Sequence, residues 1–112
     1  MSQVPENAEH LDALFTALGN AKRRGMLHSL ATKPSTVGQL AEEQQLSLPA
    51  IHRHIRDLEA ANLIQRKKVG RTNFIALKRS GLQEALSWIS QYHAYWGADQ
   101  ETLENYIRHF KP

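Results

Sequence analysis

Hydrophobic residues recur along the first part of this chain at three- and four-residue intervals, the spacing of one face of an α-helix. The spacing predicts one helix from about Asn7 to Leu18 and another from about Ala21 to Ala31. Gly19 is expected to end the first helix in the left-handed conformation. Pro34 is expected to end the second, because the residue before a proline is driven out of the helical region.

Two further helices are predicted in close succession. Ser35 or Thr36 is a suitable N-cap for a short helix in the segment TVGQLAEEQQ. Ser47 is a suitable N-cap for the next helix, which carries a proline in its first turn, where a missing N–H does no harm. Asn62 tolerates the left-handed conformation in which such a helix can end. The buried stripe of this fourth helix is expected to be Ile51, Ile55 and Leu58.

Two short runs of strand-forming residues, 63–69 and 73–78, flank the turn Gly70-Arg71-Thr72. Runs of this kind on either side of a glycine-containing turn predict a β-hairpin. Ile64 and Phe74 are expected to face the core of the protein.

The apolar spacing becomes helical again from Ser80, and Asp99 is expected to cap a last helix. A short turn that joins a small helix to a basic helix, followed by a basic hairpin, predicts a winged helix-turn-helix. The expected fold is mainly α (α+β), with a two-stranded β-hairpin wing, in a single domain over residues 1–112. Residues 1–6 are expected to be disordered, and residues 80–112 to form C-terminal dimerisation helices.

The positive charge of the chain is concentrated in one third of it. Residues 47–79 contain eight Lys and Arg and only two acidic residues, whereas residues 1–46 and 80–112 each carry a small acidic excess. Such a concentration is typical of a surface that binds a polyanion. Charge alone leaves open the alternative of a basic surface that only faces solvent.

Composition excludes several other classes of protein. Cysteine is absent, which excludes disulfides and thiolate metal sites. The polar N-terminus is unlike a secretory signal peptide, and no apolar run approaches the roughly 18 residues of a membrane span. We therefore expect a cytoplasmic protein with no membrane partner. The sequence has no Ser/His/Asp constellation, carboxylate pair or glycine-rich phosphate loop, so we expect no enzyme and no cofactor.

The chain contains, in this order, the segments LFTALGNAKRRGMLHSL, TVGQLAEEQQLSLPAIHRHIRDLEAANLI and RKKVGRTNFIAL, which span about residues 11 to 79. The first resembles the opening of the ArsR family of bacterial repressors, where a helix meets a basic second helix. The second resembles the family's helix-turn-helix, and the third resembles its wing. The family residues that recur in the helix-turn-helix are here Ser47, Pro49, His54-Ile55, Leu58 and Ala61.

The chain departs from the family pattern in two residues and in its metal ligands. His52 stands where the family commonly has a small polar residue, which leaves the base preference open, and Asn62 stands where glycine is common. Metal-sensing members use Cys pairs near the recognition helix, or His and Asp pairs after the wing. Here His93 and Asp99 are six residues apart, on poorly matched helix faces. The segment WISQYHAYW resembles the subgroup without a metal site, so no metal site is predicted.

The outward face of the fourth predicted helix is expected to enter a major groove. Arg53 is expected to read a base, because a guanidinium can bond bidentately to guanine, and His52 can reach a base edge. Ser47 and Arg56 are expected to hold phosphates, and Arg71 at the wing tip to reach the minor groove or its phosphates. The predicted DNA-binding residues are Thr36, Ser47, Pro49, Ala50, His52, Arg53, Arg56, Arg66, Lys68, Arg71 and Thr72.

Other basic residues have more than one interpretation. His54 lies on the flank of the fourth helix and is expected to be structural rather than a DNA contact. Lys67 and Lys68 either neutralise phosphates or protect an exposed strand edge from aggregation. The basic triplet at residues 22–24 is a candidate for contact with a flanking phosphate.

The aromatic residues after the wing are expected to form a dimer interface with the first helix. A core this small cannot bury so many of them, and large aromatic residues are favoured at the centres of interfaces. Burial in the core and a small-molecule pocket between protomers are the alternatives. The predicted interface residues are Leu11, Leu14, Phe15, Trp88, Ile89, Tyr92, Trp96, Leu103 and Ile107.

Three functional hypotheses follow. The first is a homodimeric repressor whose recognition helices, about 34 Å apart, read a pseudo-palindrome in double-stranded DNA. The second is a sensor in which a metal or ligand, held near His93, Asp99 and His109, controls DNA release; its effector is unknown. The third is a winged helix that binds protein, which exposed apolar residues on the groove face would favour.

Overall fold

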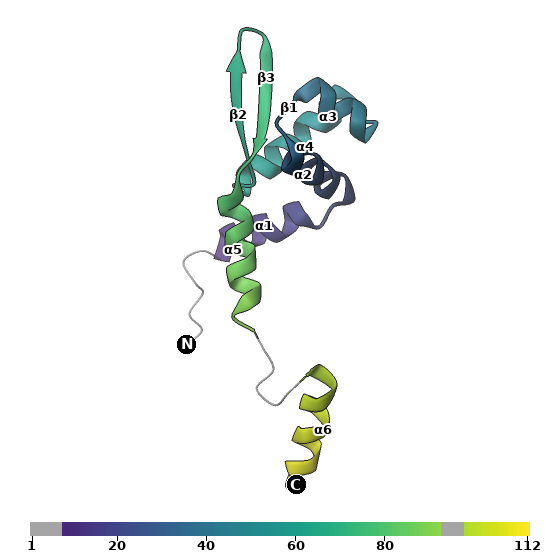
Figure 1. The fold of residues 1–112 in the computed structure, drawn as a ribbon, viewed down its shortest axis with the longest axis vertical. Helices are drawn as coiled ribbons and strands as arrows, with labels where there is room; N and C mark the ends of the chain where they lie inside the picture. Colours follow the sequence, from purple (N-terminus) through teal and green to yellow (C-terminus); the bar gives the residue numbers. More distant parts are fainter. Residues whose placement is uncertain (1–7, 93–97) are drawn as a thin grey trace.

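The computed structural model describes residues 8–92 and 98–112 (Figure 1). Helices and strands follow one another in the predicted order, with one short strand added before the third helix. Their bounds are α1 Ala8–Leu18, α2 Ala21–Thr32, β1 Ser35–Thr36, α3 Val37–Gln44, α4 Leu48–Ala60, β2 Ile64–Val69, β3 Thr72–Leu77, α5 Arg79–Ser90 and α6 Asp99–His109. The fold is a winged helix-turn-helix, as predicted.

The added strand makes the wing part of a three-stranded antiparallel sheet with the order β1-β3-β2. Ser35 pairs with Ile75 and Thr36 with Phe74, so the middle of β3 is paired on both sides. A two-residue strand shows no alternation of apolar and polar positions, which is why periodicity did not predict it.

The hairpin differs from its prediction in the loop and in one buried side chain. Thr72 is already paired in β3, so the loop has only two residues, and Gly70 supplies the left-handed conformation with φ +63°. Ile64 is buried, as predicted. Phe74 was expected in the core but is 42% exposed, and Ile75 is buried instead. Successive side chains of a strand point to opposite faces, so burial of Ile75 turns Phe74 outward.

One apolar core joins the helices to the sheet. The predicted stripe of α4 is confirmed, because its three members are fully buried. Each such side chain stabilises the fold by about 1.5–3 kcal/mol when it leaves water, so α4 is fixed on the domain by one face. The largest fully buried side chains are Leu14, Met26, Leu40, Ile51, Ile55, Leu58, Leu63 and Ile75.

The ends of α1 and α4 follow different rules. Asn62 takes the left-handed conformation after α4, with φ 61°, as predicted. Gly19 was expected to do the same after α1 but does not. The chain instead passes directly into α2, whose N-cap Asn20 accepts a hydrogen bond from the backbone N–H of Arg23 at 3.1 Å. The N-cap of the second helix, rather than a glycine cap, therefore decides where the chain turns.

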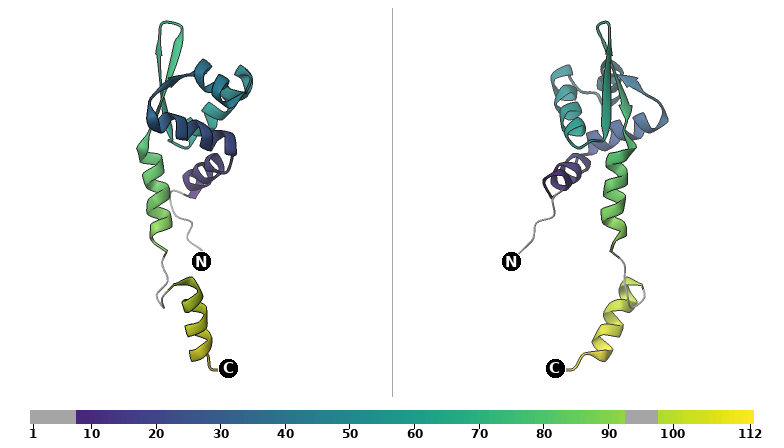
Figure 2. Two further views of the ribbon diagram at one scale, coloured as in Figure 1. Left: turned by 45° about the vertical axis from the view of Figure 1, so that its right-hand side comes forward. Right: turned by 90° about the vertical axis from the view of Figure 1, so that its left-hand side faces the viewer.

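The C-terminal helices extend the molecule well beyond its core (Figure 2). The principal extents are 68 × 32 × 21 Å and the radius of gyration is 19.3 Å, whereas a compact chain of this length would have about 13 Å. Ala98 occupies the N-cap position of α6, so the cap predicted at Asp99 lies one residue earlier. The expectations for residues 1–6 and for Trp96 lie outside the described residues.

Candidate nucleic-acid interface

The short turn between α3 and α4 is determined by residues at the helix ends. Thr36 and Gln39 form a capping box at the start of α3, in which each side chain accepts a hydrogen bond from the other residue's backbone N–H. Gln45 ends α3 in the left-handed conformation, with φ 55°, which the sequence analysis missed. Ser47 then caps α4 by accepting from the backbone N–H of Ala50 at 3.3 Å. These caps fix α4 relative to α3, as a helix-turn-helix requires.

The outward face of α4 is polar and basic. Arg53 and Arg56 are exposed, and His52 is half-buried. At the N-terminal end, Pro49 is exposed and Ala50 is half-buried. The structure therefore brings the predicted residues of this helix to its accessible side. Leu48, the first residue of α4, is also exposed.

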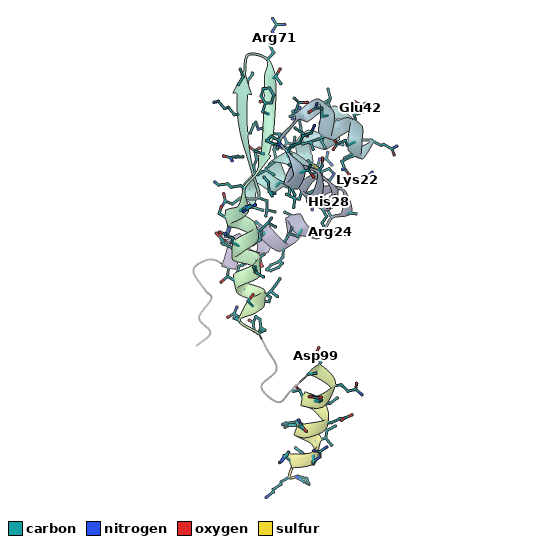
Figure 3. All side chains as sticks on the ribbon, viewed as in Figure 1. Lys22, Arg24, His28, Glu42, Arg71 and Asp99 are labelled. Carbon is teal, nitrogen blue, oxygen red and sulfur yellow. The ribbon has the colours of Figure 1, made fainter. Side chains whose placement is uncertain are left out.

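The hairpin carries a second group of exposed basic residues. Lys67, Lys68 and Thr72 are exposed on the two strands. Arg71 lies at the tip, at the far end of the hairpin from α5 (Figure 3). Val69 is exposed beside it. The wing thus projects cationic side chains beyond the body of the domain.

Arg66 is exposed as predicted but already has an anionic partner. Its Nε donates to Glu59 Oε2 at 3.2 Å, and its Nη2 donates to Glu59 Oε1. This hydrogen bonding raises the pKa of Arg66 above its usual value. The pair connects the wing to the C-terminal part of α4, so Arg66 has less free charge for a phosphate than Lys67 or Arg71 has.

His54 has the structural role that the sequence favoured. Its Nδ1 lies 3.2 Å from Nη1 of Arg23. Because a guanidinium has only donors, Nδ1 must accept this hydrogen bond, which leaves the ring proton on Nε2. Burial lowers the pKa of His54 below its usual value; the charge of Arg23 adds to the lowering, and Asp57 opposes it. His54 is therefore a neutral acceptor inside the domain.

The basic triplet of α2 makes hydrogen bonds within the protein, although Lys22 and Arg24 remain exposed. The Arg23 side chain is buried. Lys22 Nζ donates to the Gln44 carbonyl at 2.7 Å, and Arg24 Nη1 donates to the Leu18 carbonyl at 2.9 Å. Both carbonyls are at helix C-termini, where cations are favoured. The triplet thus links helix ends within the protein.

The predicted dimer residues fall into three groups. Leu11 and Phe15 of α1 lie with Trp88 of α5 around an open groove of about 390 Å³, and the rings of Phe15 and Trp88 are 5.4 Å apart. Ile89 is exposed farther along α5, and Tyr92 is exposed just after that helix ends.

The second group is on α6, where Leu103 and Ile107 are both exposed. The third group is Leu14 alone, which was predicted at the interface but is fully buried in the protomer's own core, so it offers no surface to a partner. It lies on the side of α1 that faces the other helices of the domain.

Within residues 8–92 and 98–112, no group of three or more His, Cys, Asp or Glu could hold a metal ion. Asp99 and His109 fall in this range, whereas His93 lies outside it. Among the same residues, no helix is long and apolar enough to cross a membrane.

Comparisons with known proteins agree with this geometry. Residues 20–66 match the family model described as "Bacterial regulatory protein, arsR family". The transcriptional repressor SdpR of Bacillus subtilis is 27% identical over 82 residues, which are 73% of this chain and 91% of SdpR. The nodulation protein NolR of Rhizobium meliloti is 28% identical over 99 residues, which are 88% of this chain and 79% of NolR.

Solved structures share the fold. The crystal structure of the ArsR family transcriptional regulator RHA00566 superposes with a TM-score of 0.71 at 26% identity, and covers 99% of this chain and all of that one. A Mycobacterium bovis fragment, described as a homodimeric winged helix-turn-helix DNA-binding domain, superposes with a TM-score of 0.64 at 18% identity, over 81% of this chain and 89% of the fragment.

Proposed function

This chain is a transcriptional regulator of the ArsR family, and from that premise we propose that it acts as a homodimeric repressor that binds a pseudo-palindromic operator in double-stranded DNA. A protein of this kind acts in the cytoplasm, where bacterial DNA is found. The observation that carries the proposal is the coincidence of charge and fold: the one strongly basic third of the sequence forms α4 and the wing.

The two basic elements have separate roles in this proposal. Arg53 reads a base in the major groove, since it is exposed on the helix that the helix-turn-helix presents. Arg56, Lys68 and Arg71 neutralise phosphates, and so supply affinity without reading sequence. Arg71 at the wing tip reaches farthest along the duplex. The half-buried His52 beside Arg53 makes a further contact with a base edge.

Pairing of two copies is proposed through α1 and α5, with α6 included. Large apolar side chains are exposed on α5 and α6, and Leu11 and Phe15 of α1 are only partly buried, which leaves more apolar surface in water than an isolated domain of this size usually shows. A two-fold dimer would present two α4 helices to successive major grooves, about 34 Å apart. The operator is then a pseudo-palindrome, because the symmetry of the site follows that of the protein.

Selection of bound sequences from random duplex DNA tests the proposal directly. We expect an enriched motif with two inverted half-sites about 10 base pairs apart, centre to centre. Its affinity should fall steeply as salt is raised, because each phosphate contact releases counterions. An absence of enrichment, or binding insensitive to salt, would contradict DNA recognition and favour a protein partner for the same face.

A pair of matched variants locates the reading residue. Arg53→Gln should weaken binding to the selected motif and relax the preference at one base pair, by about 1–3 kcal/mol of discrimination. Arg108→Gln removes the same charge from α6, at the opposite end of the molecule from the wing tip, and should leave the preference unchanged. Equal effects of the two substitutions would point to net charge rather than base reading.

A further inference from the structure

Arg23 connects three helices through one buried guanidinium. It belongs to α2, and its side chain is only 10% exposed. Burial of a charged side chain is costly unless every donor is satisfied. Its three nitrogens all have partners, and these partners lie in two other helices.

The first set of partners is the C-terminal turn of α1. Nε of Arg23 donates to the Ala17 carbonyl at 2.8 Å, and Nη2 donates to the Thr16 carbonyl at 2.8 Å. Carbonyls in the last turn of a helix have no partner within that helix and form the negative end of its dipole. Arg23 therefore closes the end of α1 from outside.

The second set of partners is on α4. Nη1 of Arg23 donates to Asp57 Oδ2 at 3.1 Å and lies 3.2 Å from the accepting Nδ1 of His54. His54 and Asp57 are three residues apart and so form one patch on the helix. The patch lies beside the buried stripe and adjoins the face that carries Arg53 and Arg56.

The planar guanidinium of Arg23 makes this connection between α1 and α4 rigid. Its nitrogens have fixed relative directions, so bonds to α1 and α4 through the same group constrain the angle between the two helices. A lysine at this position would keep the charge but could not reach both helices with directed bonds.

We propose that Arg23 is a positioning residue for DNA recognition: it holds the recognition helix α4 at a fixed orientation on α1, so that sequence discrimination depends on a side chain that does not touch DNA. The inference rests on the proposed function, because α1 is the helix through which the two copies are proposed to pair. Orientation of α4 on α1 would then set the relative orientation of the two α4 helices in the dimer.

The test compares three variants against the wild type on the selected motif and on a scrambled duplex. Arg23→Lys should lower the ratio of the two affinities by about fivefold or more, the loss expected when one bidentate base contact is misplaced. Its slope of log affinity against log salt should not change, because Arg23 neutralises no phosphate. Asp57→Asn, at a half-exposed carboxylate, leaves the bonds of Arg23 to α1 in place and should lower the ratio in the same direction.

Arg24→Lys is the control, because exposed Arg24 also donates to the end of α1 but makes no hydrogen bond to α4 among the described residues. It should leave the ratio unchanged. A ratio that is unaltered in both Arg23→Lys and Asp57→Asn would overturn the proposal, as would a salt slope reduced by about one in Arg23→Lys. If Arg23→Lys does not fold, Asp57→Asn decides alone. A wild type without motif preference would instead refute the proposed function.

An NMR titration of His54 distinguishes two effects of the substitutions. One is the loss of a specific contact among Arg23, His54 and Asp57, and the other is a general loosening of the packing around them. Burial lowers the pKa of His54 most; the charge of Arg23 lowers it further, Asp57 raises it, and Arg53 adds a smaller lowering. Removal of the charge in Arg23→Gln should raise the pKa towards 6.5, whereas Asp57→Asn should lower it further below the wild-type value. A general loosening would raise the pKa of His54 in both variants. That result would count against the proposed contact of Arg23 with α1 and α4.

Discussion

Gly81, near the start of α5, is packed so closely on the turn after α4 that it has no room for a side chain. A Cβ at this position would lie 2.5 Å from the carbonyl oxygen of Asn62. Asn62 itself is left-handed and donates through Nδ2 to Ser80 Oγ at 3.0 Å. These residues together determine the direction in which α5 leaves the wing.

Substitution of Gly81 should therefore destabilise the protein. Gly81→Ala forces the backbone of the turn to move, at a cost typical of overpacking, about 1–3 kcal/mol in the free energy of unfolding measured with urea. Gly38→Ala is the matched control, because Gly38 is an exposed position of α3 and a Cβ there meets nothing within 4 Å. It should be neutral or stabilising by up to about 1 kcal/mol. Equal stabilities of the two variants would be inconsistent with this packing.

Individual cations in this protein differ in what they contact, although they look alike in the sequence. The side chains of Lys22, Arg23 and Arg24 end at backbone carbonyls of neighbouring helices. Arg53 and Arg71 are exposed, and no such bond is recorded for them within the described residues. Arg53 and Arg71 can therefore bind a phosphate or a base without first breaking a hydrogen bond within the protein.

At the level of elements, α4 and the wing behave as one unit. The Arg66–Glu59 pair ties β2 to α4. Both side chains are about 30% exposed, so the pair adds at most about 1 kcal/mol to stability. The pair nevertheless joins one strand of the wing directly to the C-terminal part of α4.

The wing tip should contribute affinity but not selectivity. Arg71→Gln is expected to weaken binding to all duplexes alike, and to reduce the slope of log affinity against log salt by about one, because one phosphate contact is lost. Arg71→Lys keeps the charge and should keep the slope. Fluorescence titrations at several salt concentrations measure both quantities. A changed ranking of sequences in Arg71→Gln would mean that the tip reads bases after all.

On the scale of the whole molecule, the C-terminal third exposes more large apolar side chains than an isolated chain usually does. Each of the following is at least 40% exposed: Trp88 and Ile89 on α5, Tyr92 just after it, and Leu103 and Ile107 on α6. The chain is also far more extended than a compact domain of its length. A second copy that covers α6 as well as α1 and α5 would remove this apolar area from water.

Dimerisation should fail when a charge is placed at the centre of this surface. Ile89→Glu is expected to give a monomer in sedimentation experiments, because an unpaired carboxylate would have to be buried at the interface. Affinity for the full operator should then fall at least about tenfold, since the two half-sites are no longer bound together. Gln83→Glu, at an exposed polar position of α5, is the control. A dimeric Ile89→Glu variant would place the interface elsewhere.

Much of the fold was predictable because it depends on local pattern. The stripe Ile51, Ile55 and Leu58, the N-cap Ser47 and the left-handed Asn62 were each identified from residue type and spacing, and each is found. The two-residue strand β1 and the left-handed conformation of Gln45 were not predicted, because neither has a signal in the local sequence.

The sequence by itself determined which segments are helical, which face of α4 is apolar, and that the chain's positive charge falls on α4 and the wing. These properties follow from residue type and period, which act over a few residues. The tertiary structure alone decided that Ile75 rather than Phe74 is buried, that Leu14 belongs to the core, and that Arg23 points inward. Each of these depends on what lies opposite in space, and that partner comes from a distant part of the chain.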